Sequence, residues 1–272
     1  MKSNELKQIR FDRRLDVLEM VWNAKAGHIG GSMSCIDILV CLYYQCMDIE
    51  KIHMNASDRD RFILSKGHCA EALYAILAGQ GFIQKETLKT FAAFDSILAE
   101  HPTRKVAGVE AATGALGHGL SMGVGMALAL KADKSPAKVY VLMGDGEQAE
   151  GSVWEAAMSA AKYKLNNLIA IIDRNRLQIS GSTEEVMPLD CLKDKYIAFG
   201  WDCRVCNGHD MDALIQALSQ PSNNKPIIII TETIKGYGSP IMEGKIDWHH
   251  LIPTEHEYEQ IKADLIALKG RG

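Results

Sequence analysis

Residues 138–175 read KVYVLMGDGEQAEGSVWEAAMSAAKYKLNNLIAIIDRN, and this stretch decides the fold. Its two apolar runs, VYVLM and LIAII, are continuously hydrophobic, as strands buried on both faces of a parallel sheet are. Between them we expect a helix from about Val153 to Lys164, begun by Ser152 and Glu155 at the S-x-x-E spacing of a capping box. Strand, turn, helix and strand make a βαβ unit, whose crossover is right-handed. The stretch therefore predicts an α/β fold, with a central parallel sheet flanked by helices.

The rest of the chain extends this pattern. Apolar residues recur at helical spacing in four segments, residues 15–25, 35–47, 71–81 and 119–133. Two more β-rich runs, residues 201–206 and 226–234, follow the βαβ unit as candidate strands. The sequence has no internal repeat, low-complexity tract or long Pro/Gly linker. The simplest organisation is one domain over residues 1–272, with a helical N-terminal segment over about residues 1–50.

Composition narrows the class of protein. Hydrophobic residues make up 47% of the chain and charged residues 24%, as in ordinary soluble domains. The formal net charge of −4 argues against a nucleic-acid partner, because no basic stripe neutralises phosphates. The seven cysteines follow no framework spacing, which favours a reducing compartment. The sequence shows no signal-peptide core and no apolar run approaching roughly 18 residues, so we expect a cytoplasmic protein without membrane association.

A small acidic turn ends the first strand of the βαβ unit. Asp145 stands between two glycines there, and Asn175 follows the next strand 30 residues later. Ligands of open parallel sheets bind beyond the carboxyl ends of the strands, and adjacent strands would bring these two ends together. Carboxylate, amide and carbonyl oxygens suit Mg²⁺ or Ca²⁺ and would leave coordination positions for diphosphate oxygens and water. Two unrelated polar turns are the alternative. The spacing and the matching strand ends favour a metal site.

These residues also carry a family resemblance. GDG at residues 144–146, followed about thirty residues later by Asn175, is similar to the signature of thiamine diphosphate enzymes. The signature is accompanied by four blocks: KAGHIGGSMSCIDIL (25–39), DRFILSKGHCAEALYAIL (60–77), EHPTRKVAGVEAATGALGHGLSMGVGMALA (100–129) and IKGYGSPIMEG (234–244). In this order, from about Leu15 to His249, they resemble the N-terminal, diphosphate-binding domain of transketolase.

The resemblance implies a cofactor, thiamine diphosphate, and a metal, Mg²⁺ with Ca²⁺ as a possible substitute. The implied metal ligands are the side chains of Asp145 and Asn175 and the main-chain carbonyl of Leu177. Other implied cofactor contacts are made by main-chain groups or apolar packing, at Gly146 for the diphosphate and at Gly114, Ala115 and Leu116 for the rings. Glu150 and Glu155 match acidic family positions near the site or a contact between subunits, and Glu155 competes as a capping-box residue.

Histidines recur in the same blocks. By resemblance His68 lies on the diphosphate side, while His28 and His101 lie near the reacting carbon. Imidazole suits proton transfer there because its ordinary pKa is about 6.5. The family carries another functional histidine after its GxGSP turn, and we assign it to His249, with His250 as the alternative. His118 either reaches the aminopyrimidine or is a loop residue. Lys66 and Lys235 fit solvated lysines better than phosphate ligands.

The family glutamate that polarises the aminopyrimidine belongs to a separate pyrimidine-binding domain, which this sequence does not contain. The chain therefore resembles the N-terminal subunit of a split transketolase. A second polypeptide carrying the pyrimidine domain is the expected partner, in an α2β2 heterotetramer. The implied reaction transfers a two-carbon ketol unit from a ketose phosphate to an aldose phosphate. The alternatives are the α-subunit of a 2-oxo acid dehydrogenase, and a non-catalytic cofactor-binding or assembly subunit.

Overall fold

A five-stranded parallel sheet in the order β1-β2-β3-β5-β4 forms the centre of the computed structural model, which describes residues 3–271. Its strands are β1 (Arg61–Leu64), β2 (Val139–Gly144), β3 (Leu168–Arg174), β4 (Asp202–Asn207) and β5 (Ile227–Glu232). All neighbouring pairs are parallel. The register places Gly144 of β2 opposite Asp173 of β3, so Asp145 and Asn175 leave adjacent strands at the same edge. The expected juxtaposition of these two strand ends is confirmed.

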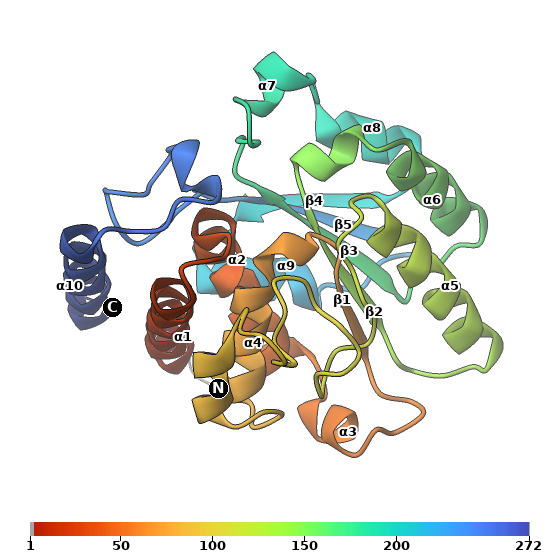
Figure 1. The fold of residues 1–272 in the computed structure, drawn as a ribbon. Helices are drawn as coiled ribbons and strands as arrows, with labels where there is room; N and C mark the ends of the chain where they lie inside the picture. Colours follow the sequence, from red (N-terminus) through yellow and green to blue (C-terminus); the bar gives the residue numbers. More distant parts are fainter. Residues whose placement is uncertain (1–2, 272) are drawn as a thin grey trace.

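Helices cover both faces of the sheet, as Figure 1 shows. One layer contains α1 (Ser3–Ala24), α2 (Ile29–Cys41), α4 (Ala70–Gly79) and α9 (Met211–Ser219). The opposite layer contains α5 (His118–Ala132), α6 (Gly151–Lys162) and α8 (Leu192–Ala198). In β2, Tyr140 and Leu142 belong to the core under the first layer. Their neighbours Val141 and Met143 belong to the core under the second layer. The strands are therefore apolar on both faces because both faces are covered.

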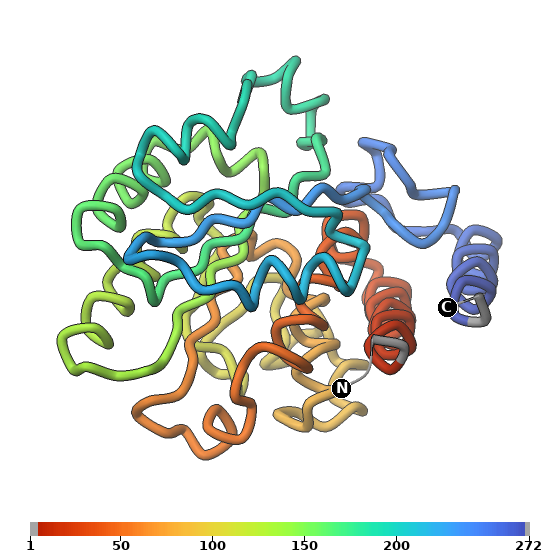
Figure 2. Tube along the Cα trace, turned by 180° about the vertical axis from the view of Figure 1, so that it is seen from behind, coloured from red at the N-terminus to blue at the C-terminus, as the bar shows by residue number. Residues whose placement is uncertain are grey.

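Shorter elements complete the chain. They are the helices α3 (Ile49–His53) and α7 (Thr183–Val186), the π-helical turn η1 (Leu42–Cys46), and the 3₁₀ turns η2 (Gly67–Cys69), η3 (Lys85–Thr90), η4 (Gly146–Ala149) and η5 (Asp247–His249). The last helix, α10 (Glu255–Arg271), packs against α1. Figures 1 and 2 show from opposite sides that the first and last helices therefore lie next to each other.

Four helices expected from apolar spacing are present as α1, α2 with η1, α4 and α5. The strand β1 was not predicted, because its run RFIL is only four residues long and carries little periodicity. The window Ile29–Cys46 is apolar and long enough to cross a membrane by length and composition, contrary to our expectation from the sequence. However, 83% of that window is buried inside the protein, so it is a core helix of the first layer.

The predicted capping box is wrong. Helix α6 begins at Gly151, and its N-cap residue Glu150 makes no side-chain capping hydrogen bond. The Ser152 hydroxyl instead donates to the carbonyl of Gly117 at 2.9 Å. Because that carbonyl belongs to the loop before α5, the serine links two segments around the edge of the sheet and does not cap its own helix. Glu155 is exposed on α6.

Candidate active site

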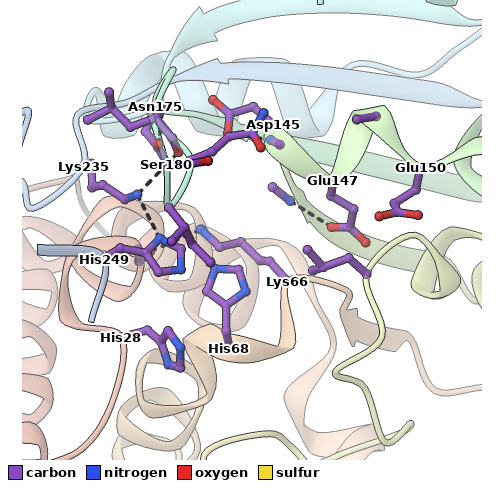
Figure 3. A pocket seen from close by; sticks show the side chains of 18 of the residues that line it. His28, Lys66, His68, Asp145, Glu147, Glu150, Asn175, Ser180, Lys235 and His249 are labelled. Atoms are coloured by element: carbon purple, nitrogen blue, oxygen red, sulfur yellow. Dashed lines mark hydrogen bonds between the residues drawn. The ribbon is translucent and has the colours of Figure 1, made fainter. Parts of the chain in front are cut away.

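A cavity of about 440 Å³ lies at the carboxyl ends of the strands. Most residues predicted for the site line it: His28, His68, His101, Gly114, Leu116, Asp145, Gly146, Glu150, Asn175, Leu177 and His249. Ala115, which was predicted as a cofactor contact, does not line it, nor does His118, whose ring is exposed. Figure 3 shows the two sides of the cavity, with Asp145 and Asn175 on one and the labelled histidines on the other.

The oxygen-rich side is held by backbone hydrogen bonds. Asp145 accepts from its neighbour Gly146 N–H at 2.8 Å and from Arg176 N–H at 2.5 Å. Asn175 accepts from Leu177 N–H at 3.2 Å. Burial and the nearby Asp173 carboxylate raise the pKa of Asp145. The Arg174 guanidinium lies 3.4 Å from this carboxylate, and a divalent ion would stabilise its ionised form further.

These residues fit a hard divalent ion and a diphosphate. The predicted ligands Asp145, Asn175 and Leu177 offer only oxygen atoms, the donor type that Mg²⁺ and Ca²⁺ take. The Gln178 amide nitrogen also lines the cavity, is buried, and has no hydrogen-bond partner among the described residues. It is free to donate to a phosphate oxygen. Gly146 leaves little room for a larger residue, since an added Cβ would lie 3.0 Å from the side chain of Gln178.

The opposite side is a histidine cluster, defined as His28, His68, His101 and His249. Four separate segments supply it: His28 precedes α2, His68 is in η2, His101 is in the loop before α5, and His249 ends η5. Ring centroids lie 5.4 Å apart for His28 and His68, 5.6 Å for His28 and His249, and 6.2 Å for His28 and His101. The fold thus brings together the four histidines that the sequence singled out. His249 lines the cavity, whereas His250 is mostly exposed.

Burial keeps three of these rings, those of His28, His101 and His249, uncharged near neutral pH. It lowers the pKa of His28 to about 4. Burial and the Lys235 ammonium lower the pKa of His249 to about 3, and burial also lowers the pKa of His101. The Lys235 ammonium lies 3.0 Å from His249 Nδ1, and an ammonium can only donate. The proton of His249 therefore sits on Nε2, which makes that nitrogen a hydrogen-bond donor.

Lys66 and Lys235 are not solvated, so that prediction is wrong. Their exposed fractions are 1% and 2%. Lys66 forms a buried ion pair with Asp173 and donates to Gly31 O at 3.2 Å. Burial, together with the Lys66 ammonium, lowers the pKa of Lys235 to about 8. Both lysines lie inside the family blocks SKGH and IKGYGSP, which was the available signal that they belong to the site.

Sequence reasoning also missed Glu147. This buried carboxylate accepts hydrogen bonds from the Ser65 hydroxyl, from Gly117 N–H at 2.8 Å and from Gly144 N–H at 3.0 Å. It therefore fastens the loop that carries Gly114 and Leu116 to the turn that carries Asp145. Nothing in the local sequence distinguishes it from a surface glutamate, because two of its three donors, Ser65 and Gly117, are 82 and 30 residues away in the chain.

A parallel sheet that presents an Asp and an Asn from adjacent strand ends to a histidine-lined cavity defines the diphosphate-binding fold of thiamine diphosphate enzymes. Residues 6–266 match the family described as transketolase, thiamine diphosphate binding domain. The chain therefore belongs to the transketolase family, and its function is that of the N-terminal, cofactor-binding part of a transketolase. The expected fold class and family are confirmed.

Relatives and solved structures agree with this assignment. The chain is 52% identical to one subunit of the apulose-4-phosphate transketolase of Phocaeicola vulgatus, covering 94% of this chain and 91% of that protein. It is 41% identical to the SqwG subunit of the 6-deoxy-6-sulfo-D-fructose transketolase of a Clostridium species, covering 91% of each chain. The crystal structure of transketolase from Campylobacter jejuni superposes with a TM-score of 0.90 at 29% identity, covering 100% of this chain and 46% of that one. The chain thus spans about half the length of that solved transketolase.

Glu71, a buried residue of α4 bonded to the backbone of His28, should make the stability of the protein depend on pH. It accepts a hydrogen bond from His28 N–H, its other oxygen has no partner among the described residues, and burial raises its pKa from 4.5 to about 8. The folded state therefore binds a proton that the unfolded state releases, and stability falls as pH rises from about 4.5 to 8. A shift of this size corresponds to about 5 kcal/mol.

We expect Glu71→Gln to remove this contribution. As pH rises, the stability of the wild type should therefore fall relative to that of the variant. Urea midpoints at pH 5, 6, 7 and 8 measure the effect. Between pH 5 and pH 8 the difference in unfolding free energy between the variant and the wild type should change by on the order of 1 kcal/mol or more. Glu86→Gln, at an exposed glutamate, is the matched control and should follow the wild type. Parallel pH curves for the wild type and Glu71→Gln would show that the carboxyl is not protonated in the folded state.

Gly30 holds the segment of His249 close to α2. An added Cβ at Gly30 would lie 2.4 Å from the carbonyl oxygen of Trp248. Gly125 in α5 is the matched control, because a Cβ added there meets nothing within 4 Å. Alanine is favoured over glycine inside helices by about 1 kcal/mol, so Gly125→Ala should stabilise the protein. Gly30→Ala should instead destabilise it by about 1–3 kcal/mol and weaken cofactor binding, because the backbone before His249 must move. Urea unfolding and cofactor titration of both variants test this, and stabilisation by both changes would contradict it.

Proposed function

We propose that this chain is the diphosphate-binding subunit of a two-chain transketolase that moves a two-carbon ketol unit from a ketose phosphate to an aldose phosphate. The observation that carries the proposal is the cavity itself. Asp145, Asn175 and Leu177 line one space of about 440 Å³ together with the histidine cluster, a volume typical of small-molecule sites. The names of the two relatives given above, both transketolase subunits, support the same interpretation.

We assign each residue a role from its position in the cavity. Asp145, Asn175 and the Leu177 carbonyl hold Mg²⁺, or Ca²⁺ in its place. Gly146 and His68 face the diphosphate. When bound, thiamine diphosphate supplies the nucleophilic carbon and the electron sink that carbon–carbon cleavage requires.

The substrate side belongs to the other three histidines. His28, His101 and His249 are uncharged near neutral pH, as their lowered pKa values imply. A neutral imidazole can accept a proton at one nitrogen while it donates at the other, so these rings hold the substrate hydroxyls and move protons between them. Lys235 fixes the ring of His249 with its donating nitrogen, Nε2, available.

The second chain supplies the pyrimidine-binding domain, in an α2β2 heterotetramer. The relatives are named as single subunits of their transketolases, which implies a further subunit in those proteins. In this structure Leu116 and Ile179 line the cavity, yet they are 36% and 72% exposed. Apolar side chains exposed at the mouth of a site are a surface that a partner would bury.

The decisive experiment measures ketol transfer by the purified chain with and without the product of the adjacent reading frame. We expect little or no transfer by the chain alone and full transfer by the mixture, with magnesium and thiamine diphosphate present in both. Full activity of the isolated chain would refute the two-chain site. Donors should include apulose 4-phosphate and 6-deoxy-6-sulfofructose, which occur in the names of the relatives, beside ordinary ketose phosphates.

A further inference from the structure

We propose that His28, Glu100 and His250 form a binding site for a zinc-class divalent cation at the rim of the cavity, and that an ion held there inhibits the enzyme. Three separate segments supply the residues: His28 precedes α2, Glu100 lies in the loop between η3 and α5, and His250 follows η5. One ligand atom of each residue lies within 4.8 Å of the others. His250 Nε2 is 3.8 Å from a Glu100 carboxylate oxygen, and the rings of His28 and His250 are 4.7 Å apart between centroids.

The donor set matches zinc. Two imidazoles and one carboxylate are a common set of protein ligands for Zn²⁺, with a fourth position left open for water or substrate. Bonds of 2.0–2.2 Å in a tetrahedron place ligand atoms about 3.3–3.6 Å apart, so atoms separated by up to 4.8 Å must close by up to about 1.5 Å. The side chains of Glu100 and His250 are 38% and 58% exposed and can rotate to do so.

The His28 ring has the hydrogen-bonding state and the charge that a third metal ligand needs. Its Nδ1 is buried and has no hydrogen-bond partner among the described residues, so turning the ring toward an ion breaks no hydrogen bond at that atom. The ring is also uncharged near neutral pH, and a neutral imidazole is the form that binds metals. The geometry, with three donors converging from three loops, does not depend on this charge state.

The site differs from the one proposed for magnesium. That site offers only oxygen donors, on the opposite side of the cavity, whereas this one offers mainly nitrogen, which zinc prefers. Glu100 and His250 do not line the cavity, but His28 does. An ion at the rim would therefore draw the His28 ring toward the outside. On the proposed function His28 binds substrate, so the bound ion would inhibit ketol transfer.

Calorimetric titration of the purified chain with zinc chloride, in saturating magnesium, tests the site without requiring activity. We expect one site whose affinity falls at least about tenfold in His250→Ala and in Glu100→Gln. His256→Ala, at an exposed histidine outside the trio, and Asp145→Ala should leave zinc affinity unchanged. Diffraction at the zinc edge should place the ion between His28, Glu100 and His250. Unchanged affinity in both ligand variants, or an ion at Asp145 or at a cysteine, would overturn the proposal.

Inhibition is tested separately with the reconstituted two-chain enzyme. Zinc should reduce ketol transfer by the wild type, and His250→Ala should need at least about tenfold more zinc for the same loss, with its activity unchanged when zinc is absent. Zinc binding at the trio without loss of activity would overturn the inhibitory role. If no ketol transfer occurs even without zinc, the proposed function has failed, while calorimetry still decides whether the metal site exists.

Discussion

Asp145→Asn is expected to lower ketol transfer by the reconstituted enzyme at least about a hundredfold, because loss even of outer-shell partners of a metal costs 10–100-fold. The asparagine keeps the shape of the side chain and can still accept from Gly146 N–H. It loses the charge that binds a divalent ion. Its NH₂ group would also point at Arg176 N–H, which is itself a donor, or at the ion. Magnesium-dependent binding of thiamine diphosphate, followed by calorimetry, should weaken in parallel with activity.

Asp210→Ala is the matched control for this experiment. Asp210 caps α9 by accepting from two backbone N–H groups, so its loss costs about 1 kcal/mol of stability. It lies outside the cavity lining and should leave cofactor affinity unchanged. The two variants separate a local loss of metal binding from general destabilisation. If Asp145→Asn retained magnesium-dependent cofactor binding, the metal site would have to be assigned to other residues, and a high residual activity would identify the chain as an assembly subunit.

The Asp145 site could be predicted because its geometry follows from strand adjacency. Two continuously apolar runs joined by one helix become neighbouring parallel strands, and their ends then meet whatever the rest of the chain does. The histidine cluster was different. No periodicity places His28, His68, His101 and His249 together, since they lie in four loops or turns. Only the resemblance to transketolase grouped them.

The errors have a common physical cause. Ser152 and Glu155 have the spacing of a capping box, but the serine finds a better acceptor in Gly117, which is 35 residues away. Lys66 was interpreted as solvated because its partner Asp173 is 107 residues away in the chain. Side-chain partners at such separations are set by the completed fold, so local spacing does not reveal them. The same holds for Glu147, whose donors Ser65 and Gly117 are 82 and 30 residues away, whereas only its third donor, Gly144 N–H, is local.

The buried Lys66–Asp173 pair leads to the second large expected effect. Lys66→Met keeps an unbranched side chain one atom shorter and removes its charge, so the Asp173 carboxylate loses its cationic partner inside the protein. Breaking a buried ion pair in this way costs about 3–5 kcal/mol of unfolding free energy. The remaining side-chain donors to Asp173, the hydroxyls of Ser34 and Thr233 and the amide of Asn175, are neutral and cannot replace the ammonium. Urea unfolding at pH 7 measures the loss.

A double variant shows whether the charge, rather than the volume, is responsible. In Lys66→Met with Asp173→Asn neither member of the pair is charged, and the amide oxygen still accepts from Ser34, so the double variant should lose less stability than the sum of the single variants. Lys51→Met breaks an ion pair with Asp58 whose partners are 36% and 42% exposed, and should cost much less stability than Lys66→Met because water screens the pair. Equal losses in Lys66→Met and Lys51→Met would mean that the pair near the cavity is solvated in solution.

Because Lys66 and Asp173 join η2 to the carboxyl end of β3, the single variant Lys66→Met should also separate the histidine side of the cavity from its metal side and weaken cofactor binding.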